Sequence, residues 1–275
     1  GGVHHDVLAQ AAATVDALFR LIDAGIRPLD VMTQRAFENA ITTLYAMGGS
    51  TNLYLHVLAV ARDAQVPLTI DRIQQVGERV PLIANLQPHG PYAMAALHAI
   101  GGVPVVMKEL LRHGLLHGDV LTVTGRTLTE NLADVPTLEE LGEQDVVWPV
   151  GAPIAPPDHH ISVLRGNLAP ESCVLKLSGK TLAQGRFRGT ARVFESEADA
   201  MAAIRAGLVV AGDVVVVRNV GPVGGPGMPE WGGLPIPKKL LQAGVRDMLR
   251  LSDARMSGTH FGSCVLHIAP ESAVG

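Results

Sequence analysis

The sequence predicts an α/β protein in which a helix-rich N-terminal α/β portion is followed by a β-barrel-like C-terminal domain. Up to residue 113, apolar residues recur mainly at helical spacing, in segments bounded by glycine or proline. Residues 131–157 are acidic and rich in proline, which interrupts this pattern and stiffens the chain. Beyond them, short β-type runs alternate with glycine-rich turns, which favours a small barrel or sandwich over a doubly wound sheet. We therefore predict two domains, residues 1–145 and residues 146–275, the second beginning with the linker.

The predicted elements follow from local sequence signals. In the first domain, Thr33 is a suitable N-cap, and Gly25 and Gly48 stand where helices would end. The predicted helices span residues 7–24, 33–48, 52–64, 69–79, 91–100 and 104–113, and the first strand spans residues 119–124. In the second domain, the predicted strands span residues 173–177, 190–194, 213–220, 248–251 and 264–268, and one helix spans residues 197–206.

Composition argues against several classes of partner. The 275 residues carry a formal net charge of −4 with a pI near 6.3, and Lys and Arg are not clustered, so we expect neither nucleic acid nor an anionic membrane as a partner. No apolar run approaches the roughly 20 residues that a membrane span needs. We expect a soluble, cytoplasmic protein that acts on a small molecule.

The chain has two cysteines, Cys173 and Cys264, each in the context Ser-Cys-Val-Leu at the start of an apolar run. This position is typical of small buried core residues. Two separated thiols cannot supply the four-cysteine shell that iron–sulfur clusters commonly use, and no Cys-x-x-Cys pair is present. We therefore expect no cluster ligand in this chain and no disulfide, which is consistent with a reducing compartment.

A strand followed by a glycine-rich loop is the most informative feature of the sequence. The apolar run 214–217 leads into GPVGGPGMPE, which ends on Glu230, and a second apolar run leads into SDARMSG, which contains Ser257. Glycine allows the backbone to approach a ligand closely, and loops at strand ends commonly carry functional residues. We interpret the two loops as the rim of an active site. A phosphate-binding or nucleotide-binding loop is the alternative from another class, although this loop lacks the Lys-Ser/Thr end of that motif.

Several motifs carry a resemblance to a known family. GGPGMPE at 224–230, DARMSG at 253–258 and HIAPE at 267–271 are similar to the C-terminal signature of the dihydroxy-acid and phosphogluconate dehydratases. AFENAI at 36–41, GGSTN at 48–52, TVTGRT at 122–127 and LRGNL at 164–168 follow the order found in that family. The resemblance covers nearly the whole chain, and it implies an α/β N-terminal domain and a barrel-like C-terminal domain.

The resemblance implies a hydro-lyase that removes water from a 2,3-dihydroxy acid and leaves a 2-oxo acid, assisted in the complete enzyme by an iron–sulfur cluster and Mg²⁺. By position, Glu230 resembles the family's C-terminal magnesium ligand and Ser257 its catalytic base. Arg255, Thr259 and His267 are candidates for substrate binding. We also expect a homo-oligomer, either a dimer or a tetramer. A non-catalytic homologue or partner subunit that supplies half of a site is a further alternative.

Two features refine this expectation. The Ala-Arg-Met sequence at 254–256 and the segment 259–267 resemble the sugar-acid members, such as arabinonate and xylonate dehydratases, more than the branched-chain members. We therefore expect a sugar acid as substrate, with a branched-chain dihydroxy acid as the alternative. The family's cluster cysteines and its Asp-Lys metal motif have no counterpart here. We accordingly expect a fragment, inactive alone, that holds the C-terminal portion of the N-terminal domain and a truncated second domain.

Overall fold

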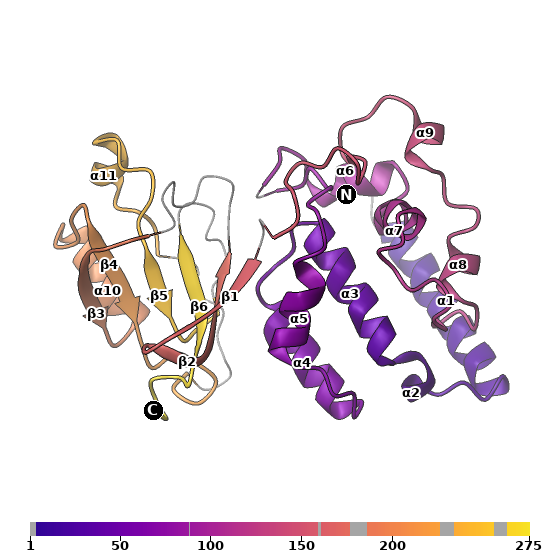
Figure 1. Cartoon of the computed structure of the whole chain (residues 1–275), viewed down its shortest axis with the longest axis horizontal. Helices are drawn as coiled ribbons and strands as arrows, with labels where there is room; N and C mark the ends of the chain where they lie inside the picture. The colour runs from indigo at the N-terminus through magenta and orange to yellow at the C-terminus, as the bar shows by residue number, and fades with distance from the viewer. Residues whose placement is uncertain (1–3, 88, 159–160, 177–185, 226–233, 256–262) are drawn as a thin grey trace. The chain divides into compact units, whose positions relative to one another are not determined.

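The computed structural model describes residues 4–87, 89–158, 161–176, 186–225, 234–255 and 263–275 (Figure 1). The chain divides into two compact units: Gly1–Gly49 with Leu53–Pro156, and Ser50–Asn52 with Pro157–Gly275. The first unit is helical, and the second contains a β-sheet. Among the described helices, none combines the length and the apolar composition needed to cross a bilayer. The predicted domain boundary at residues 145/146 stays a prediction.

The first unit has nine helices among its described residues. They are α1 (His4–Asp23), α2 (Pro28–Val31), α3 (Gln34–Ala46), α4 (Leu53–Asp63), α5 (Ile70–Gly77), α6 (Met94–Ala99), α7 (Val103–Arg112), α8 (Leu128–Asn131) and α9 (Leu138–Leu141). Thr33 and Thr69 cap α3 and α5, because each hydroxyl accepts a hydrogen bond from the backbone N–H three residues ahead. Gly25, with φ of +68°, ends the turn after α1. The six predicted helices are confirmed, and the short α2, α8 and α9 are additional.

Helix α3 contacts α4, α5 and α7 in the helical core. Its buried face carries Ile41 and Tyr45, and α5 contributes Ile73. Gly77 of α5 allows the close approach of the Tyr45 ring, because a Cβ at that position would lie 2.2 Å from the ring. Burial of each large aliphatic side chain contributes about 1.5–3 kcal/mol, so this core accounts for the packing of the helices around α3.

Residues 119–124 do not form the predicted strand. The segment makes one isolated bridge and turns at Gly125, which has φ of +77°. The Thr122 N–H donates to the Arg126 carbonyl at 2.9 Å. The β-type composition of the segment is real, but its hydrogen-bonding partner is the chain only a few residues ahead. A tight turn therefore replaces an extended strand.

The second unit is built on one six-stranded mixed sheet in the described residues (Figure 1). Its strands are β1 (Ile161–Gly166), β2 (Ala169–Lys176), β3 (Thr190–Phe194), β4 (Asp213–Val217), β5 (Arg250–Ser252) and β6 (Cys264–Ala269), in the order β1-β2-β6-β5-β4-β3. β1, β2 and β6 pair antiparallel, whereas β6, β5, β4 and β3 pair parallel. The five predicted strands of this domain are confirmed, and β1 is additional.

The connections of the sheet differ from those expected of a small barrel or sandwich. Helix α10 (Glu197–Arg205) follows β3 and precedes the parallel strand β4, so this part is a β-α-β unit of the kind found in doubly wound sheets. β1 and β3 stand at the two ends of the strand order, and closure into a barrel is not confirmed in the described residues. Short apolar runs predict strands, but they do not reveal that a helix carries the chain back to start a parallel neighbour.

The residues of the sheet contribute to two apolar clusters. The first combines strand residues with residues of α10 and of α11 (Lys238–Gln242): Val215, Val217, Cys264, Leu266, Ala200 and Leu240. The second contains Ala169, Cys173, Leu175 and Val265. Neighbouring residues of β6 therefore belong to different clusters, as the period-two geometry of a strand requires. Both cysteines are buried, as predicted, and they lie in different clusters.

Both thiols should react slowly in the folded protein. Burial raises the pKa of the Cys173 and Cys264 thiols, which reduces the fraction of reactive thiolate. A chromogenic disulfide reagent at mildly alkaline pH should label both cysteines promptly in denaturant and neither of them promptly in native protein. Prompt labelling of native protein would contradict this packing, and single Cys→Ala variants would identify which thiol is exposed.

Candidate functional site

The three motif loops of the second unit begin at one edge of the sheet. β4, β5 and β6 run parallel, so their carboxyl ends lie at the same edge, where ligands of open α/β sheets commonly bind. The described parts of the loops after these strands are residues 218–225, 253–255 and 270–275. They contain the beginning of the glycine-rich motif, the beginning of DARMSG and the end of HIAPE.

Asp253 connects all three loops and is only 6% exposed. Its Oδ1 accepts a hydrogen bond from the Val220 N–H at 3.1 Å. Its Oδ2 accepts bonds from the Asn219 N–H at 3.2 Å and the Ser272 N–H at 3.0 Å, and the Ser272 hydroxyl donates to the same oxygen at 2.5 Å. Asn219, Val220 and Ser272 are half-buried and lie outside the strands, so this carboxylate accepts backbone donors that the sheet does not pair.

Glu271 contacts the glycine-rich loop directly and is 9% exposed. Its Oε1 accepts a bond from the Val223 N–H at 2.7 Å, and its Oε2 accepts one from the Gly224 N–H at 3.1 Å. Gly221 allows this approach, because a Cβ there would lie 2.2 Å from the Glu271 Oε2 and 2.9 Å from its Cβ. Two of the motif glycines are thus required by packing, since a Cβ on Gly224 would lie 2.7 Å from the Asn219 carbonyl carbon.

Two of the predicted substrate-binding residues lie close to these loops. His267 occupies a bulge in β6, where two β6 residues stand opposite one residue of β2, and its φ is +55°. Its N–H donates to the Ala254 carbonyl at 3.3 Å, which joins β6 to the start of the DARMSG loop. Arg255 follows in the same loop and is half-buried. The structure thus brings the segments of Arg255 and His267 together, while their role in binding stays a prediction.

Three other predicted site residues, Glu230, Ser257 and Thr259, lie outside the described residues. Their roles as magnesium ligand, catalytic base and substrate contact therefore stay predictions. Sequence reasoning gave no role to Asp253 or Glu271, although each acid comes shortly after a strand-type run. The position after a strand was the only sequence signal for these two acids. Without the geometry, a carboxylate that accepts backbone N–H bonds cannot be distinguished from a metal ligand or a solvated acid.

The described residues do not by themselves fit a magnesium ion or an iron–sulfur cluster. Within them, no group of three or more His, Cys, Asp or Glu side chains could hold a metal ion. The carboxylates of Asp253 and Glu271 bond to backbone N–H groups, and the two cysteines lie in different apolar clusters. A metal-binding role is therefore not assigned to these four residues.

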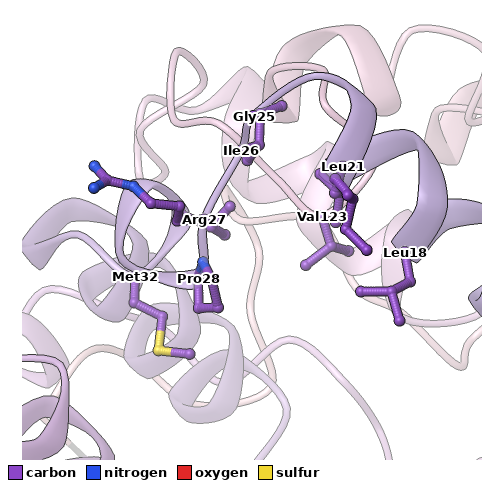
Figure 2. Close-up of a pocket in the computed structure, with 10 residues that line it drawn as sticks. Leu18, Leu21, Gly25, Ile26, Arg27, Pro28, Met32 and Val123 are labelled. Carbon is purple, nitrogen blue, oxygen red and sulfur yellow. The ribbon is translucent and has the colours of Figure 1, made fainter.

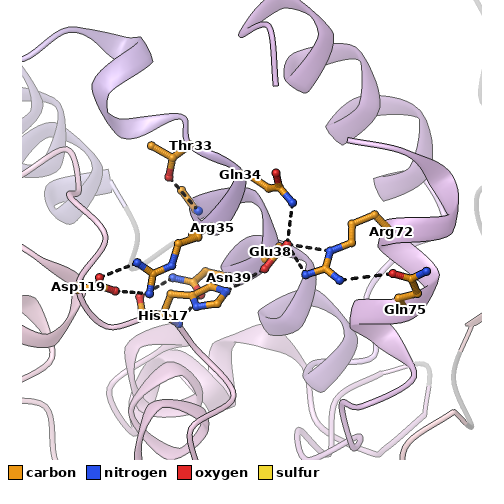
Figure 3. A network of polar contacts seen from close by, with 10 residues as sticks. Thr33, Gln34, Arg35, Glu38, Asn39, Arg72, Gln75, His117 and Asp119 are labelled. Carbon is orange, nitrogen blue, oxygen red and sulfur yellow. Dashed lines mark hydrogen bonds and ion pairs between the residues drawn. The ribbon is translucent and has the colours of Figure 1, made fainter. Parts of the chain in front are cut away.

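In the first unit, the AFENAI motif forms a partly buried polar network (Figure 3). The Glu38 Oε1 accepts bonds from the Arg72 Nε at 2.8 Å and Nη2 at 2.7 Å, and its Oε2 lies 2.9 Å from the His117 Nε2. The Asn39 side chain bonds to the backbone N–H and carbonyl of His117 at 2.8 and 2.9 Å. The motif thus joins α3 to α5 and to the turn at residue 117, which explains it structurally.

Hydrogen bonding outweighs burial in setting the charge of Glu38. Burial raises the pKa of a carboxyl group, but the bonds from His117, Arg72 and Gln34 hold the pKa of Glu38 below its ordinary value of 4.5. Glu38 is therefore ionised at neutral pH, and its charge is paired with Arg72. A buried carboxylate with this pairing stabilises the helical unit only while it stays ionised.

The TVTGRT motif has a similar structural explanation. The Asn131 Nδ2 donates to the Thr122 hydroxyl oxygen at 2.6 Å, which closes the turn. Thr127 and Glu130 form a capping box at the start of α8, because each side chain accepts a bond from the other residue's backbone N–H. Neither AFENAI nor TVTGRT therefore needs a catalytic role to explain its residue types.

A cavity of about 600 Å³ lies beside α1 in the first unit (Figure 2). Its lining is almost entirely apolar, including Leu18, Ile26 and Val123, and its one charged lining residue, Arg27, is paired with Asp30 at 2.9 Å. None of the five predicted site residues lines it. Recognition of a small hydroxy acid requires several convergent polar groups, so we do not assign the active site to this cavity.

Replacing Glu38 with Gln should destabilise the helical unit by about 1–3 kcal/mol at neutral pH, because Arg72 loses its charge partner. The pKa of Glu38 is lowered by folding, so its contribution is complete above the unfolded value of 4.5 and is lost as the pH falls through the lower folded value. Urea unfolding should therefore show a difference between wild type and Glu38→Gln that narrows below pH 4.5.

Glu143→Gln is a matched control, because Glu143 is an exposed acid of the same unit. It should change the free energy of unfolding little at any pH. A difference between wild type and Glu38→Gln that is absent at neutral pH, or that grows in acid, would contradict the inferred pairing.

Comparison with known proteins places the two units in one family. Residues 2–131 match the dihydroxy-acid/6-phosphogluconate dehydratase N-terminal domain, and residues 145–275 match the C-terminal domain of the same family. Similar relatives include proteins named dihydroxy-acid dehydratase from Leptothrix cholodnii (46% identical over 99% of this chain and 48% of that protein), Prochlorococcus marinus (49% over 96% and 47%) and a Synechococcus strain (51% over 96% and 47%). The chain spans about half the length of the curated relatives it matches. It belongs to the dihydroxy-acid/6-phosphogluconate dehydratase family.

Proposed function

We propose that the protein to which this chain belongs is a hydro-lyase that removes water from a 2,3-dihydroxy acid and releases a 2-oxo acid. The observation that carries the proposal is the similarity to proteins named dihydroxy-acid dehydratase, at 46–51% identity over at least 96% of the chain. Both domain matches support it, because the match to the N-terminal domain precedes the match to the C-terminal domain along the chain. At this level of identity, the reaction class is a better supported inference than the identity of the substrate.

For the substrate, we favour a branched-chain 2,3-dihydroxy acid. The relatives are named for a dihydroxy acid and not for a sugar acid, whereas the sequence-based preference for a sugar acid rests on a few residues around Arg255. Met256 and Thr259 stand among those residues and lie outside the described part of the chain. The sugar acid is therefore the second candidate, and substrate preference is the property to measure first.

Removal of water from such an acid needs a base for the proton on C2 and help for the departure of the C3 hydroxyl. We propose Ser257 as the base and Glu230 as a magnesium ligand, both from the resemblance to the family. An iron–sulfur cluster and Mg²⁺ would supply Lewis-acid assistance in the complete protein. The described residues do not form a site for either group, so no step is assigned to them here.

The alternative of a phosphate-binding loop has less support. Anion-binding loops use free backbone N–H groups, as in phosphate-binding loops. In the described part of this loop, the Asn219 and Val220 N–H groups bond to Asp253, and those of Val223 and Gly224 bond to Glu271. The loop thus directs its donors to the protein's own carboxylates, and an incoming phosphate would have to displace a negative charge.

The intact protein should convert 2,3-dihydroxy-3-methylbutanoate to its 2-oxo acid faster than it converts five-carbon sugar acids. The reason is that the three relatives compared above carry the dihydroxy-acid name. The two substrate classes differ in alkyl and hydroxyl groups, which make different contacts with an enzyme. Trapping of the 2-oxo product with a carbonyl reagent measures both rates. A higher kcat/KM for arabinonate or xylonate would reverse the substrate assignment, and inactivity with every dihydroxy acid would overturn the reaction class.

Ser257→Ala should lower kcat by about 10²–10⁴-fold, the usual contribution of a general base, with little change in KM. Exchange of the C2 proton of substrate with deuterium from solvent should vanish in this variant. Ser263→Ala is a control in the same segment, because the Ser263 hydroxyl donates to Asp247 at 2.7 Å and lies in the protein interior. Wild-type exchange in Ser257→Ala would show that the base is another residue.

A further inference from the structure

The loop after β4 is held by the carboxylates of Asp253 and Glu271, which belong to two other loops. Glu271 stands after β6, yet its two oxygens accept the N–H groups of the successive residues Val223 and Gly224 at 2.7 and 3.1 Å. Hydrogen bonds to an ionised acceptor are stronger than neutral ones, and two of them in parallel fix an orientation as well as a distance.

We propose that Glu271 is a positioning residue that sets the backbone path of the described part of the glycine-rich loop at residues 223–224, and that Asp253 fixes the start of that loop. This inference rests on the proposed function, because the loop leads in sequence to Glu230, which is proposed to act in the site. Glu271 itself touches the loop backbone, so it acts on the chemistry only through the loop.

Gly221 provides an independent observation for the same contact. A Cβ at this position would lie 2.2 Å from the Glu271 Oε2 and 2.9 Å from its Cβ and Cδ. The Cβ of Glu271 belongs to the rigid part of the side chain, so rotation of the carboxylate alone would not remove the clash. The sequence therefore leaves space at residue 221 for the acid at residue 271.

Asp253 anchors the other end of the loop. It accepts the N–H groups of Asn219 and Val220, and it also accepts two bonds from Ser272, the neighbour of Glu271. Asn219 has φ of +62°, in the left-handed region that Asn adopts more readily than most other non-glycine residues. Asp253 and Glu271 thus hold residues 219–224 at both ends, from loops that follow two different strands.

The test compares Glu271→Gln and Gly221→Ala with two controls in the intact protein. Gln keeps the shape of Glu but places an NH₂ group against one N–H donor, and Ala at residue 221 displaces the carboxylate. Glu195→Gln is the control acid, since Glu195 contacts the side chains of Arg218 and Asn219 and no backbone N–H among the described residues of this loop. Gly166→Ala is the control glycine, because nothing lies within 4 Å of its added Cβ.

Two readouts separate positioning from stability alone. Hydrogen exchange of the Val223 and Gly224 amides should become at least about tenfold faster in Glu271→Gln and Gly221→Ala, as expected for loss of a hydrogen bond to a charged group. The kcat for the dihydroxy acid, corrected for the folded fraction, should fall by up to about 10²-fold while KM stays near the wild-type value. The double variant should be little worse than either single variant, because both disrupt one contact.

Each result decides a separate question. Unchanged amide exchange in both variants would contradict the inferred hydrogen bonds from the Val223 and Gly224 amides to Glu271. Faster exchange with wild-type kcat would overturn the positioning role and leave a structural contact. If wild-type protein dehydrates no dihydroxy acid, the proposed function fails, and amide exchange then decides by itself whether Glu271 holds the loop.

Discussion

Backbone N–H groups in a loop that leaves a sheet need acceptors, and in this protein two buried carboxylates supply them. The described residues 218–225 of the glycine-rich loop after β4 form no regular helix or strand, so several of their N–H donors need acceptors outside the loop. Asp253 and Glu271 accept these donors from neighbouring loops. Hydrogen bonds between loops thus hold the candidate site together. The parallel strands β4, β5 and β6 place the starts of those loops at the same edge of the sheet.

The parallel half of the sheet makes this arrangement possible. In an antiparallel sheet, consecutive neighbours end at opposite edges, and their following loops would be separated by the length of a strand. Helix α10 returns the chain so that β4 starts beside β3 in the same direction, and β5 and β6 continue the parallel order. Its residue Ala200 and α11's Leu240 belong to the same apolar cluster as Val215 of β4. The packing of α10 against the sheet therefore supports the parallel strand order that places the loops of the candidate site at one edge.

Sequence alone predicted the local elements well and the long-range pairing poorly. Thr33, Thr69 and Gly25 are signals within one turn of the helix ends they mark, so the helices could be predicted from them. Residues 119–124 have strand-like composition but no partner strand among the described residues, and composition cannot show whether a partner exists. Closure into a barrel likewise depends on pairings far apart in sequence, and the described residues do not confirm it.

The candidate site shows the same division. The glycine-rich and DARMSG segments could be placed in one site from their motifs, and the described beginnings of both do meet at one sheet edge. The role of Asp253 and Glu271 as acceptors for backbone N–H groups could not be predicted. From sequence alone, an acid in a motif can equally be a metal ligand, a base or a backbone acceptor. Glu38 in the first unit shows the same ambiguity. It lies in a motif that resembles the family, yet its contacts with Arg72 and His117 join parts of the fold.

The bulge at His267 limits which changes in length β6 can tolerate. Ser172 pairs with Ala269 and Val174 pairs with Leu266, so β6 has one residue more than β2 between these pairs. As a result Val265 and Ile268, three residues apart, contribute to the same apolar cluster, which regular alternation would forbid. Deleting one residue here would restore alternation and keep Ala269 opposite Ser172, but it would remove the bulge and with it the bond from the His267 N–H to the Ala254 carbonyl. Substitutions in β6 are therefore easier to accommodate than insertions or deletions. Transfer of this site to another protein would require the bulge as well as the HIAPE motif.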